Sequence, residues 1–154
     1  MLCARREQWL TPALDELRAK GFRAEGRVCD VTDEQQVQAV VQAAVSAYGR
    51  VDILVNNAGI SWGERPETMS LDNFRKVLDT NLTGAFLFAQ AAGRVMLEAK
   101  RGAIINMSSR SGLVGIPGAA AYASSKAAII GPSSAAATHL RKLFAAGSPA
   151  RGNA

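Results

Sequence analysis

The sequence has few cysteines and no long apolar run. Its two cysteines, Cys3 and Cys29, are too few and too unpatterned for a disulfide scaffold and favour a reducing compartment. No run reaches the roughly 18 apolar residues of a membrane-spanning helix. The residues after Met1 lack the apolar stretch of a secretory signal peptide. We therefore expect a cytoplasmic protein without a membrane partner, and no metal site is predicted.

Basic residues outnumber acidic ones, but they are scattered. The 18 lysines and arginines against 13 acidic residues give a formal net charge of +5. They form isolated pairs, with no basic run and no interleaved aromatic residues, which a single-strand binder would need. We predict no nucleic-acid partner and assign the charge to solvated helix faces, with one or two arginines available to bind a phosphate.

Apolar runs and helical patterns alternate along the chain. Strands are predicted over 22–30, 51–56 and 103–108, and helices over 11–20, 32–49, 71–100 and from 119 onward. Thr11 and Pro12 mark the start of the first helix, and Thr32 with Gln35 forms a capping box. At 154 residues the chain has the size of one domain. This alternation predicts a parallel sheet of the α/β class, with ligands beyond the carboxyl ends of the strands.

Tyr122 and Lys126 form the most informative pair. If residues 119–131 are helical, the two side chains stand on the same face, because residues four apart are neighbours. Free tyrosine has a pKa of about 10, so acid–base work near neutral pH needs a decrease of roughly 3 units, about 4 kcal/mol. A lysine charge at ~4 Å in a partly screened site supplies on the order of 4 kcal/mol. The alternative is a tyrosine ring packed on a lysine stem.

Further motifs occur in a fixed order around this pair. Residues 56–59 (NNAG) follow an apolar strand, and Asn81 lies in a long helical stretch. Ser109 ends another apolar strand and precedes Tyr122 by thirteen positions. Residues 29–31 close a third strand. This ordered set resembles the short-chain dehydrogenase/reductase family.

The resemblance covers the chain from Cys3 to about Ile130 and implies a partial Rossmann-like, doubly wound parallel sheet. The family's T-G-x-x-x-G-x-G turn between its first strand and first helix is absent, and so is its later strand with a Pro-Gly turn. We therefore expect a member truncated at both ends. An incomplete domain over 1–131 would lack the first strand and the glycine-rich turn, and a divergent, partly disordered tail would follow over 132–154.

The missing first strand poses a physical problem. In the family's order it lies between the second and fourth strands, so the predicted strands 22–30 and 51–56 would lack a common partner. About ten backbone groups would be unpaired or would bind water instead. Each one that is truly buried without a partner would cost ~1–3 kcal/mol of stability. Total domain stability is only about 5–15 kcal/mol. We expect the chain alone to be marginal or unfolded unless another chain or a rearranged pairing fills the gap.

The resemblance implies a role for each catalytic position. Tyr122 would donate a proton to a carbonyl or accept one from an alcohol, and Lys126 would lower its pKa and hold the nicotinamide ribose. Ser109 would hydrogen-bond the substrate oxygen, with the other serines of 108–111 as alternatives. Asn81 would support a water relay behind the lysine, or it would merely kink its helix.

Cofactor-binding positions also follow from the resemblance. Asp30 and Val31 would meet the adenine, and the alternative for Asp30 is a residue at the start of a helix. Asn57, Ala58 and Gly59 would line the floor beneath the cofactor. All of these positions follow apolar strands, where ligands of parallel sheets bind.

Arg5 bears on the choice between the two nicotinamide cofactors. In the resembling family an acidic residue after the second strand would bind the ribose hydroxyls of NAD, whereas here Ala4 is followed by Arg5. The guanidinium group of an arginine can donate two hydrogen bonds to one phosphate group, so the extra phosphate of NADP favours this cofactor over NAD. The alternative is an exposed arginine at a frayed terminus.

The resemblance therefore predicts an NADP-dependent oxidoreductase. It would transfer a hydride between NADP(H) and a small-molecule ketone or secondary alcohol, with a 3-oxoacyl thioester as one candidate and Tyr122 as acid–base group. The alternative is a catalytically inactive fragment that acts by association with a full-length relative. Helices 71–100 and 119–131 resemble the family's dimer-forming pair and could also form a homo-oligomer.

Overall fold

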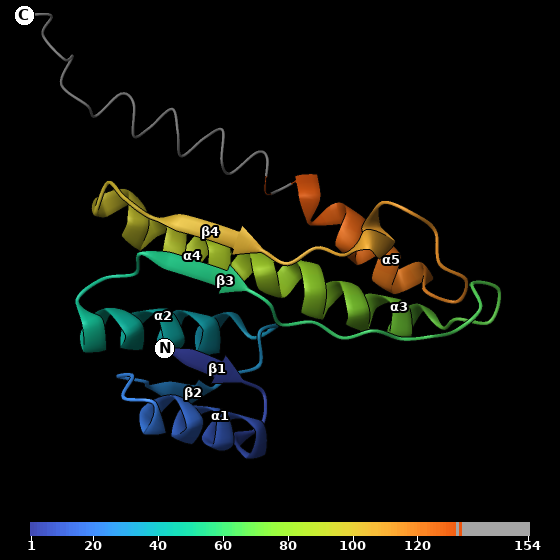
Figure 1. Cartoon of the computed structure of the whole chain (residues 1–154). Coiled ribbons are helices and arrows are strands. Elements are labelled where there is room, and N and C mark those ends of the chain that lie inside the picture. The colour runs from blue at the N-terminus through green and yellow to red at the C-terminus, as the bar shows by residue number, and fades with distance from the viewer. Residues whose placement is uncertain (132, 134–154) are drawn as a thin grey trace, which may run out of the picture.

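The computed structural model describes residues 1–131 and 133, in which strands and helices alternate (Figure 1). The strands of this part of the chain are β1 (Leu2–Ala4), β2 (Gly26–Val28), β3 (Ile53–Asn56) and β4 (Ala103–Asn106). The helices are α1 (Glu7–Ala19), α2 (Glu34–Tyr48), α3 (Leu71–Leu78), the π-helix η1 (Asp79–Thr83), α4 (Gly84–Glu98), the 3-10 helix η2 (Arg110–Gly112) and α5 (Ala120–Ala128). The predicted α/β class is confirmed.

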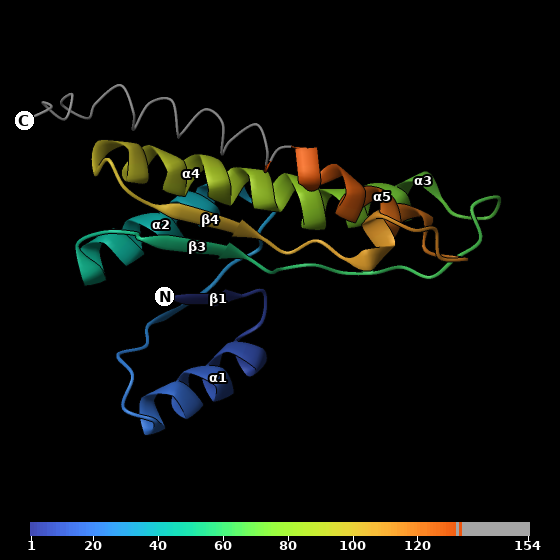
Figure 2. The same ribbon diagram turned by 45° about the horizontal axis from the view of Figure 1, so that its top comes forward.

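The strands form two parallel pairs rather than one sheet. β1 pairs with β2, with Leu2 opposite Gly26 and Ala4 opposite Val28, and β3 pairs with β4. The four arrows point the same way in Figure 1, and β1, β3 and β4 keep this common direction in Figure 2. Within the described residues the two pairs are separate sheets.

The observed pairing corrects one prediction. The strand predicted over 22–30 does not border the gap, because only Gly26–Val28 is paired and its partner is β1. The prediction took this strand as the neighbour of the missing one, whereas the short strand Leu2–Ala4 already occupies that place. The two strands without a common partner are therefore β1 and β3.

Two predicted helices differ from the observed ones. The sequence predicts a start at Thr11, but α1 begins earlier and carries Pro12 in its interior. Leu10 and Leu14 are buried against β1 and β2, and this packing outweighs the loss of one helical hydrogen bond. The helix predicted over 71–100 is interrupted, because η1 inserts a wider turn between α3 and α4.

The cap of α2 also differs from the predicted capping box. Asp33 is the N-cap, and its carboxylate accepts a hydrogen bond from Gln36 N at 3.0 Å. Thr32, the predicted cap, hydrogen-bonds the carboxylate of Asp30 through its N and Oγ1. An ionised carboxylate accepts a stronger hydrogen bond than a hydroxyl, so the aspartate takes the cap.

The main apolar core lies between the helices α2 and α4 and the pair β3–β4. Val37 and Val41 of α2 are buried with Phe88 and Met96 of α4, and Leu54 of β3 packs against them. This core holds β3 and β4 along α4, so that their carboxyl ends point toward α3 and α5 (Figure 1). The polar residues that follow those strands are thereby brought near the two helices.

No helix in the described part of the chain is long and apolar enough to cross a membrane. The tail predicted over 132–154 lies outside the described residues, except for Ser133, whose hydroxyl donates to Ile129 O at 2.6 Å. The predicted boundary at residue 131 therefore remains a prediction.

We expect the isolated chain to be marginally stable. The two separate strand pairs leave backbone groups along β1 and β3 without a strand partner, at ~1–3 kcal/mol for each group that is buried. Circular dichroism during heating should give a Tm below ~50 °C, toward the lower end for mesophilic domains. A cooperative transition above ~50 °C would contradict this expectation.

Candidate functional site

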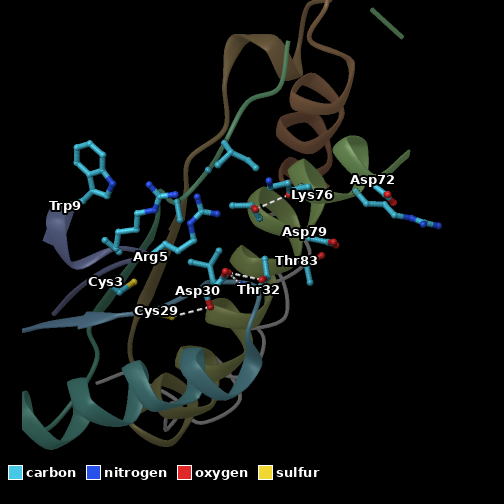
Figure 3. Close-up of a pocket in the computed structure, with 18 residues that line it drawn as sticks. Cys3, Arg5, Trp9, Cys29, Asp30, Thr32, Asp72, Lys76, Asp79 and Thr83 are labelled. Carbon is cyan, nitrogen blue, oxygen red and sulfur yellow. Dashed lines mark hydrogen bonds between the residues drawn. The ribbon is translucent and has the colours of Figure 1, made fainter. Parts of the chain in front are cut away.

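A cavity of about 940 Å³ lies beyond the carboxyl ends of β1 and β2, beside α3 (Figure 3). The predicted cofactor positions that line it are Arg5, Asp30, Val31, Ala58 and Gly59. Asn57 lies instead on the wall of a neighbouring cavity between β1 and β3. The volume falls in the range of about 300–1,000 Å³ found for sites that enclose small ligands. The predicted positions that line this ligand-sized space thus come from three separate segments of the chain.

The wall of this cavity carries a cluster of cations. Arg5 and Arg6 follow β1, and Arg75 and Lys76 belong to α3. Figure 3 shows Arg5 and Lys76 on opposite sides of the cavity. Guanidinium and ammonium groups pair with phosphate oxygens, so the donor set suits a phosphorylated ligand. We refer to this space as the basic cavity.

Asp30 is held in place as a carboxylate at the edge of the basic cavity. Thr32 donates to its Oδ1 from N at 3.0 Å and from Oγ1 at 2.7 Å. These hydrogen bonds, assisted by the charge of Arg5, keep the pKa of Asp30 below its usual value against the opposing effect of burial. The next residue is held by α4, because a Cβ on Gly84 would lie 2.6 Å from Val31 Cγ2. The segment after β2 is thus fixed from two sides.

The two cysteines of the basic cavity are held as thiols rather than thiolates. Cys29 is only 1% exposed, and burial raises the pKa of its thiol to about 12. Burial also raises the pKa of the Cys3 thiol. Within residues 1–131 and 133, no group of three or more His, Cys, Asp or Glu side chains is placed to hold a metal ion.

Asn81 is the centre of a second group of polar residues. It lies in the π-helix η1 and is fully buried. Its Oδ1 accepts from Ile60 N at 2.7 Å, and its Nδ2 donates to Ile60 O and to Ser125 Oγ, each at 2.9 Å. Ser125 Oγ donates in turn to Tyr122 O at 2.7 Å. Both amide protons of Asn81 are used, and the predicted water relay remains a prediction.

Lys126 is buried beside Tyr122 on α5. Its Nζ donates to Met107 O at 2.6 Å and lies 5.8 Å from the centroid of the Tyr122 ring. The residue is 5% exposed, and burial lowers the pKa of its ammonium group. The two side chains therefore share a face of the helix, and the lysine is anchored to the chain that leaves β4.

Ser109 caps η2, which packs against α5. Its Oγ accepts a hydrogen bond from Ser111 N at 3.2 Å. Ser108 points elsewhere, and its Oγ donates to Lys126 O at 2.7 Å. A Cβ on Gly112 would lie 2.7 Å from a backbone nitrogen of α5. Glycine at this position therefore allows the serine segment to lie directly on the helix that carries Tyr122.

Gly59 connects the basic cavity to this second group. It lines the cavity, and a Cβ built on it would lie 3.3 Å from Asn81 Oδ1 and 3.6 Å from Lys126 Nζ. Asn81, Ser109, Tyr122 and Lys126, which we call the tyrosine cluster, do not themselves line the basic cavity. The candidate site thus has two adjoining parts, a cavity whose cations suit a phosphate and a cluster of polar side chains in which Asn81 and Lys126 are buried.

Sequence reasoning missed two residues that hold the tyrosine cluster. Ser125 receives the second amide proton of Asn81, and Gly112 allows the close contact between η2 and α5. A serine inside a helix gives no signal of its own, because its partner is distant in the sequence. The glycine after a serine-rich strand end was a usable signal for a close approach of two backbones.

Comparisons with known proteins show the family of this chain. The sequence profile of the short chain dehydrogenase family matches residues 1–143. The chain is 41% identical over 127 residues to the 3-oxoacyl-(acyl-carrier-protein) reductase FabG of Staphylococcus aureus, covering 82% of this chain and 52% of that protein. It is 44% identical over 108 residues to the D-threitol dehydrogenase of Mycolicibacterium smegmatis, covering 70% of this chain and 42% of that protein. The chain spans about half the length of these curated relatives.

Solved structures share the fold. A xylitol dehydrogenase bound to NAD+ superposes with a TM-score of 0.89 at 37% identity, covering 92% of this chain and 55% of that one. A metagenomic short-chain oxidoreductase in complex with NADP superposes with a TM-score of 0.86 at 35% identity, covering 93% of this chain and 64% of that one. The predicted partial Rossmann-like sheet is therefore confirmed.

Replacing Asn81 with alanine should destabilise the protein. The buried N–H and C=O of Ile60 and the hydroxyl of Ser125 would each lose a partner, at a total cost of about 2–4 kcal/mol. Asn57→Ala is the matched control, because Asn57 is exposed, and it should change stability by less than about 0.5 kcal/mol. Urea denaturation in sucrose, which strengthens folding, measures both variants. Equal losses of stability in the Asn81→Ala and Asn57→Ala variants would contradict the role assigned to Asn81.

Proposed function

The chain belongs to the short-chain dehydrogenase/reductase family, and from this premise we propose that it transfers a hydride between NADP(H) and a ketone or secondary alcohol. One observation carries the proposal: Gly59 lies both on the wall of the basic cavity and against the tyrosine cluster. A dinucleotide whose phosphates occupy the basic cavity therefore has its other end beside Tyr122 and Lys126.

In this proposal the tyrosine cluster handles the proton. A bound reduced nicotinamide supplies the hydride to the carbonyl carbon. Tyr122 donates its proton to the carbonyl oxygen, and in the reverse direction accepts one from the alcohol. Lys126, anchored by Met107 O, stabilises the phenolate by its charge and holds the nicotinamide ribose. Ser109 hydrogen-bonds the substrate oxygen, and Asn81 supports a water relay behind the lysine.

We propose NADP as the cofactor, with NAD as the weaker ligand. Arg5, Arg75 and Lys76 offer cations on two sides of the basic cavity, which suits an extra phosphate on the adenosine ribose. Asp30 and Val31 would face the adenine, and the segment 57–59 would form the floor. One similar structure holds NADP and another holds NAD+, so similarity alone favours neither.

The proposed substrate is a small ketone, with a 3-oxoacyl thioester as one candidate. The reductase of Staphylococcus aureus supports the ketone, and the D-threitol dehydrogenase supports a secondary alcohol. In this proposal the segment 60–69 would border the substrate. The supporting contact is that Glu64 N donates to Gly118 O at 2.9 Å, just before α5. Trp62 of this segment donates its Nε1 to Glu64 Oε2 at 2.9 Å and offers an apolar ring.

An inactive fragment that associates with a full-length relative is the second candidate function. The separate strand pairs favour it, because β1 and β3 lack a common partner within the described chain. Such a chain, or a homo-oligomer, would associate through the α3–α4 and α5 helices. We propose a cytoplasmic location for either form.

NADPH should raise the Tm of the purified chain, and Tyr122→Phe should separate binding from chemistry. A ligand that binds only the folded state stabilises it by about 2.7 kcal/mol at 100 times its Kd. The Tyr122→Phe variant should keep the increase in Tm with NADPH. It should reduce ketones about 10²–10⁴-fold more slowly, because it lacks the phenolic proton that the carbonyl oxygen needs. Loss of NADPH absorbance measures the rate, with Tyr48→Phe on α2 as control. An unchanged rate would contradict the role of Tyr122, and no NADPH shift would favour the inactive fragment.

Arg5→Ala should weaken NADPH binding while leaving NADH binding nearly unchanged. Loss of a charge-assisted hydrogen bond to phosphate is worth about 1.5–3 kcal/mol, or roughly tenfold or more in Kd. Arg27→Ala is the control, because Arg27 is exposed on β2 and does not line the basic cavity. Titration calorimetry with both cofactors measures the effect, and an equal loss for NADH would overturn the assignment of Arg5 to a phosphate.

A further inference from the structure

Trp9 is a large aromatic side chain on the wall of the basic cavity. It lies in the first turn of α1 and lines the cavity together with Arg5 and Arg6. Figure 3 shows Trp9 and Arg5 on one side of the cavity and Lys76 on the other. The tryptophan is 66% exposed, although aromatic side chains gain most from being covered. An exposed indole on the wall of a ligand-sized cavity is therefore a candidate to contact the ligand.

The packing of α1 does not explain Trp9. This helix is held on β1 and β2 by the buried side chains of Leu10 and Leu14. Consecutive residues of an α-helix are turned by about 100° from one another, so Trp9 lies beside this buried face and not within it. The apolar cluster around Leu10 and Leu14 does not include Trp9. The indole is thus not needed to hold the helix in place.

The polar edge and the faces of the Trp9 ring are also without partners. Within the described part of the chain, its Nε1 makes no hydrogen bond and no lysine or arginine lies over its ring. The second tryptophan, Trp62, differs in both respects. It is 39% exposed, and its Nε1 donates to Glu64 Oε2 at 2.9 Å. Trp62 is thus fixed by its own segment, whereas the indole of Trp9 is free to bind a ligand.

The neighbouring arginines determine which part of a dinucleotide reaches Trp9. Arg6 is the N-cap of α1, and its carbonyl accepts a hydrogen bond from Trp9 N at 3.1 Å. The ring therefore belongs to the same turn as the cations that follow β1. In NADP the adenine and the extra phosphate are attached to adjacent carbons of one ribose. A phosphate held by Arg5 consequently brings the adenine beside the indole.

Stacking of a base on an aromatic ring is a binding term separate from charge. The flat faces of a purine and an indole exclude water from each other, and loss of such a contact weakens binding about tenfold or more. Arginine and lysine, in contrast, bind a phosphate whatever base is attached to it. A cavity with cations alone would therefore not distinguish a nucleotide from a simple phosphate compound.

We propose that Trp9 stacks on the adenine of the bound dinucleotide and gives the basic cavity its preference for a purine ligand. This inference rests on the proposed function, which places the dinucleotide in the basic cavity. Arg5 recognises the extra phosphate, and Trp9 recognises the base next to it. Trp9 is thus a specificity-determining residue of the cofactor site, supplied by α1 and not by a strand end.

Titration calorimetry with adenosine 2′,5′-bisphosphate tests the contact. This probe carries the adenine, the ribose and the extra phosphate of NADP but no nicotinamide. Trp9→Leu should raise its Kd about tenfold, because leucine has no aromatic face, and Trp9→Phe should restore most of the affinity. Phe22→Leu is the matched control, since Phe22 is 61% exposed and does not line the basic cavity. Equal Kd values for Trp9→Leu and the unchanged chain would overturn the proposal.

Inorganic pyrophosphate separates stacking from a general disturbance of the cavity. It has no base, so Trp9→Leu and the unchanged chain should bind it with the same Kd. A loss as large as that for the adenosine probe would show that Trp9 acts through the arginines or the shape of the cavity, and the proposal would be wrong. All titrations are made in sucrose, which strengthens folding. Trp9 is exposed, so its replacement should leave the stability nearly unchanged.

Fluorescence gives a direct view of the contact. The chain has two tryptophans, so Trp62→Phe leaves Trp9 as the sole indole. Adenosine 2′,5′-bisphosphate should quench this emission with the Kd found by calorimetry. In Trp9→Phe, the emission of Trp62 should stay constant. Quenching of Trp62 alone, or of neither tryptophan, would place the base away from Trp9 and overturn the proposal.

Assays with NADPH distinguish failure of this inference from failure of the proposed function. Ketone reduction together with an NADPH Kd that Trp9→Leu leaves unchanged would reject the stacking and keep the oxidoreductase. Quenching of Trp9 and tenfold weaker binding by Trp9→Leu, without any ketone reduction, would keep the stacking and reject the oxidoreductase. A chain that does not bind the adenosine probe at all would overturn the role of Trp9.

Discussion

The buried side-chain amide of Asn81 is the interaction on which the site depends. Its Oδ1 and Nδ2 bind both backbone groups of Ile60, and its second proton goes to Ser125 on α5. Three elements distant in the sequence are thereby fixed to one another: the segment after β3, the π-helix and the helix that carries Tyr122. A polar group buried this completely is costly unless every hydrogen bond is made. The wider turn of η1 is what directs Asn81 inward among these partners.

The contacts of this amide explain how a cavity at one end of the strands is joined to chemistry on a helix. Gly59 and Ile60 belong to both regions, because they line the basic cavity and touch Asn81. Lys126 is tied to the chain after β4 through Met107 O, so the ends of β3 and β4 converge on α5. The basic cavity and the tyrosine cluster are therefore held next to each other by short polar contacts, rather than by the length of the strands.

Sequence reasoning predicted the residues whose chemistry is local and missed those whose role depends on a distant partner. The four-residue spacing of Tyr122 and Lys126 placed both on one face of α5, where they lie. Ser125 gave no signal, since only the fold shows that Asn81 reaches it. The sequence around Pro12 predicts a helix start, whereas Pro12 lies inside α1, because the packing of α1 on β1 and β2 that outweighs its cost is tertiary. For the same reason the sequence predicts the gap in the sheet next to the strand 22–30, whereas it lies next to β1. The residues of a strand do not by themselves identify the strand with which it pairs.

The chemistry of the site and the stability of the sheet are separable in this chain. Within the described residues, the hydrogen bonds that position the tyrosine cluster involve α5, η1, η2 or the segments that follow β3 and β4. All of them lie in the half of the molecule that contains β3 and β4. The basic cavity, in contrast, takes Arg5 and Asp30 from the ends of β1 and β2, and Gly59 from the segment after β3. A ligand that spans both parts needs them at a fixed distance, whereas the tyrosine cluster needs only its own half. It follows that a shift of one strand pair relative to the other acts on the basic cavity before it acts on the geometry around Tyr122, because β1 and β3 are not paired with each other.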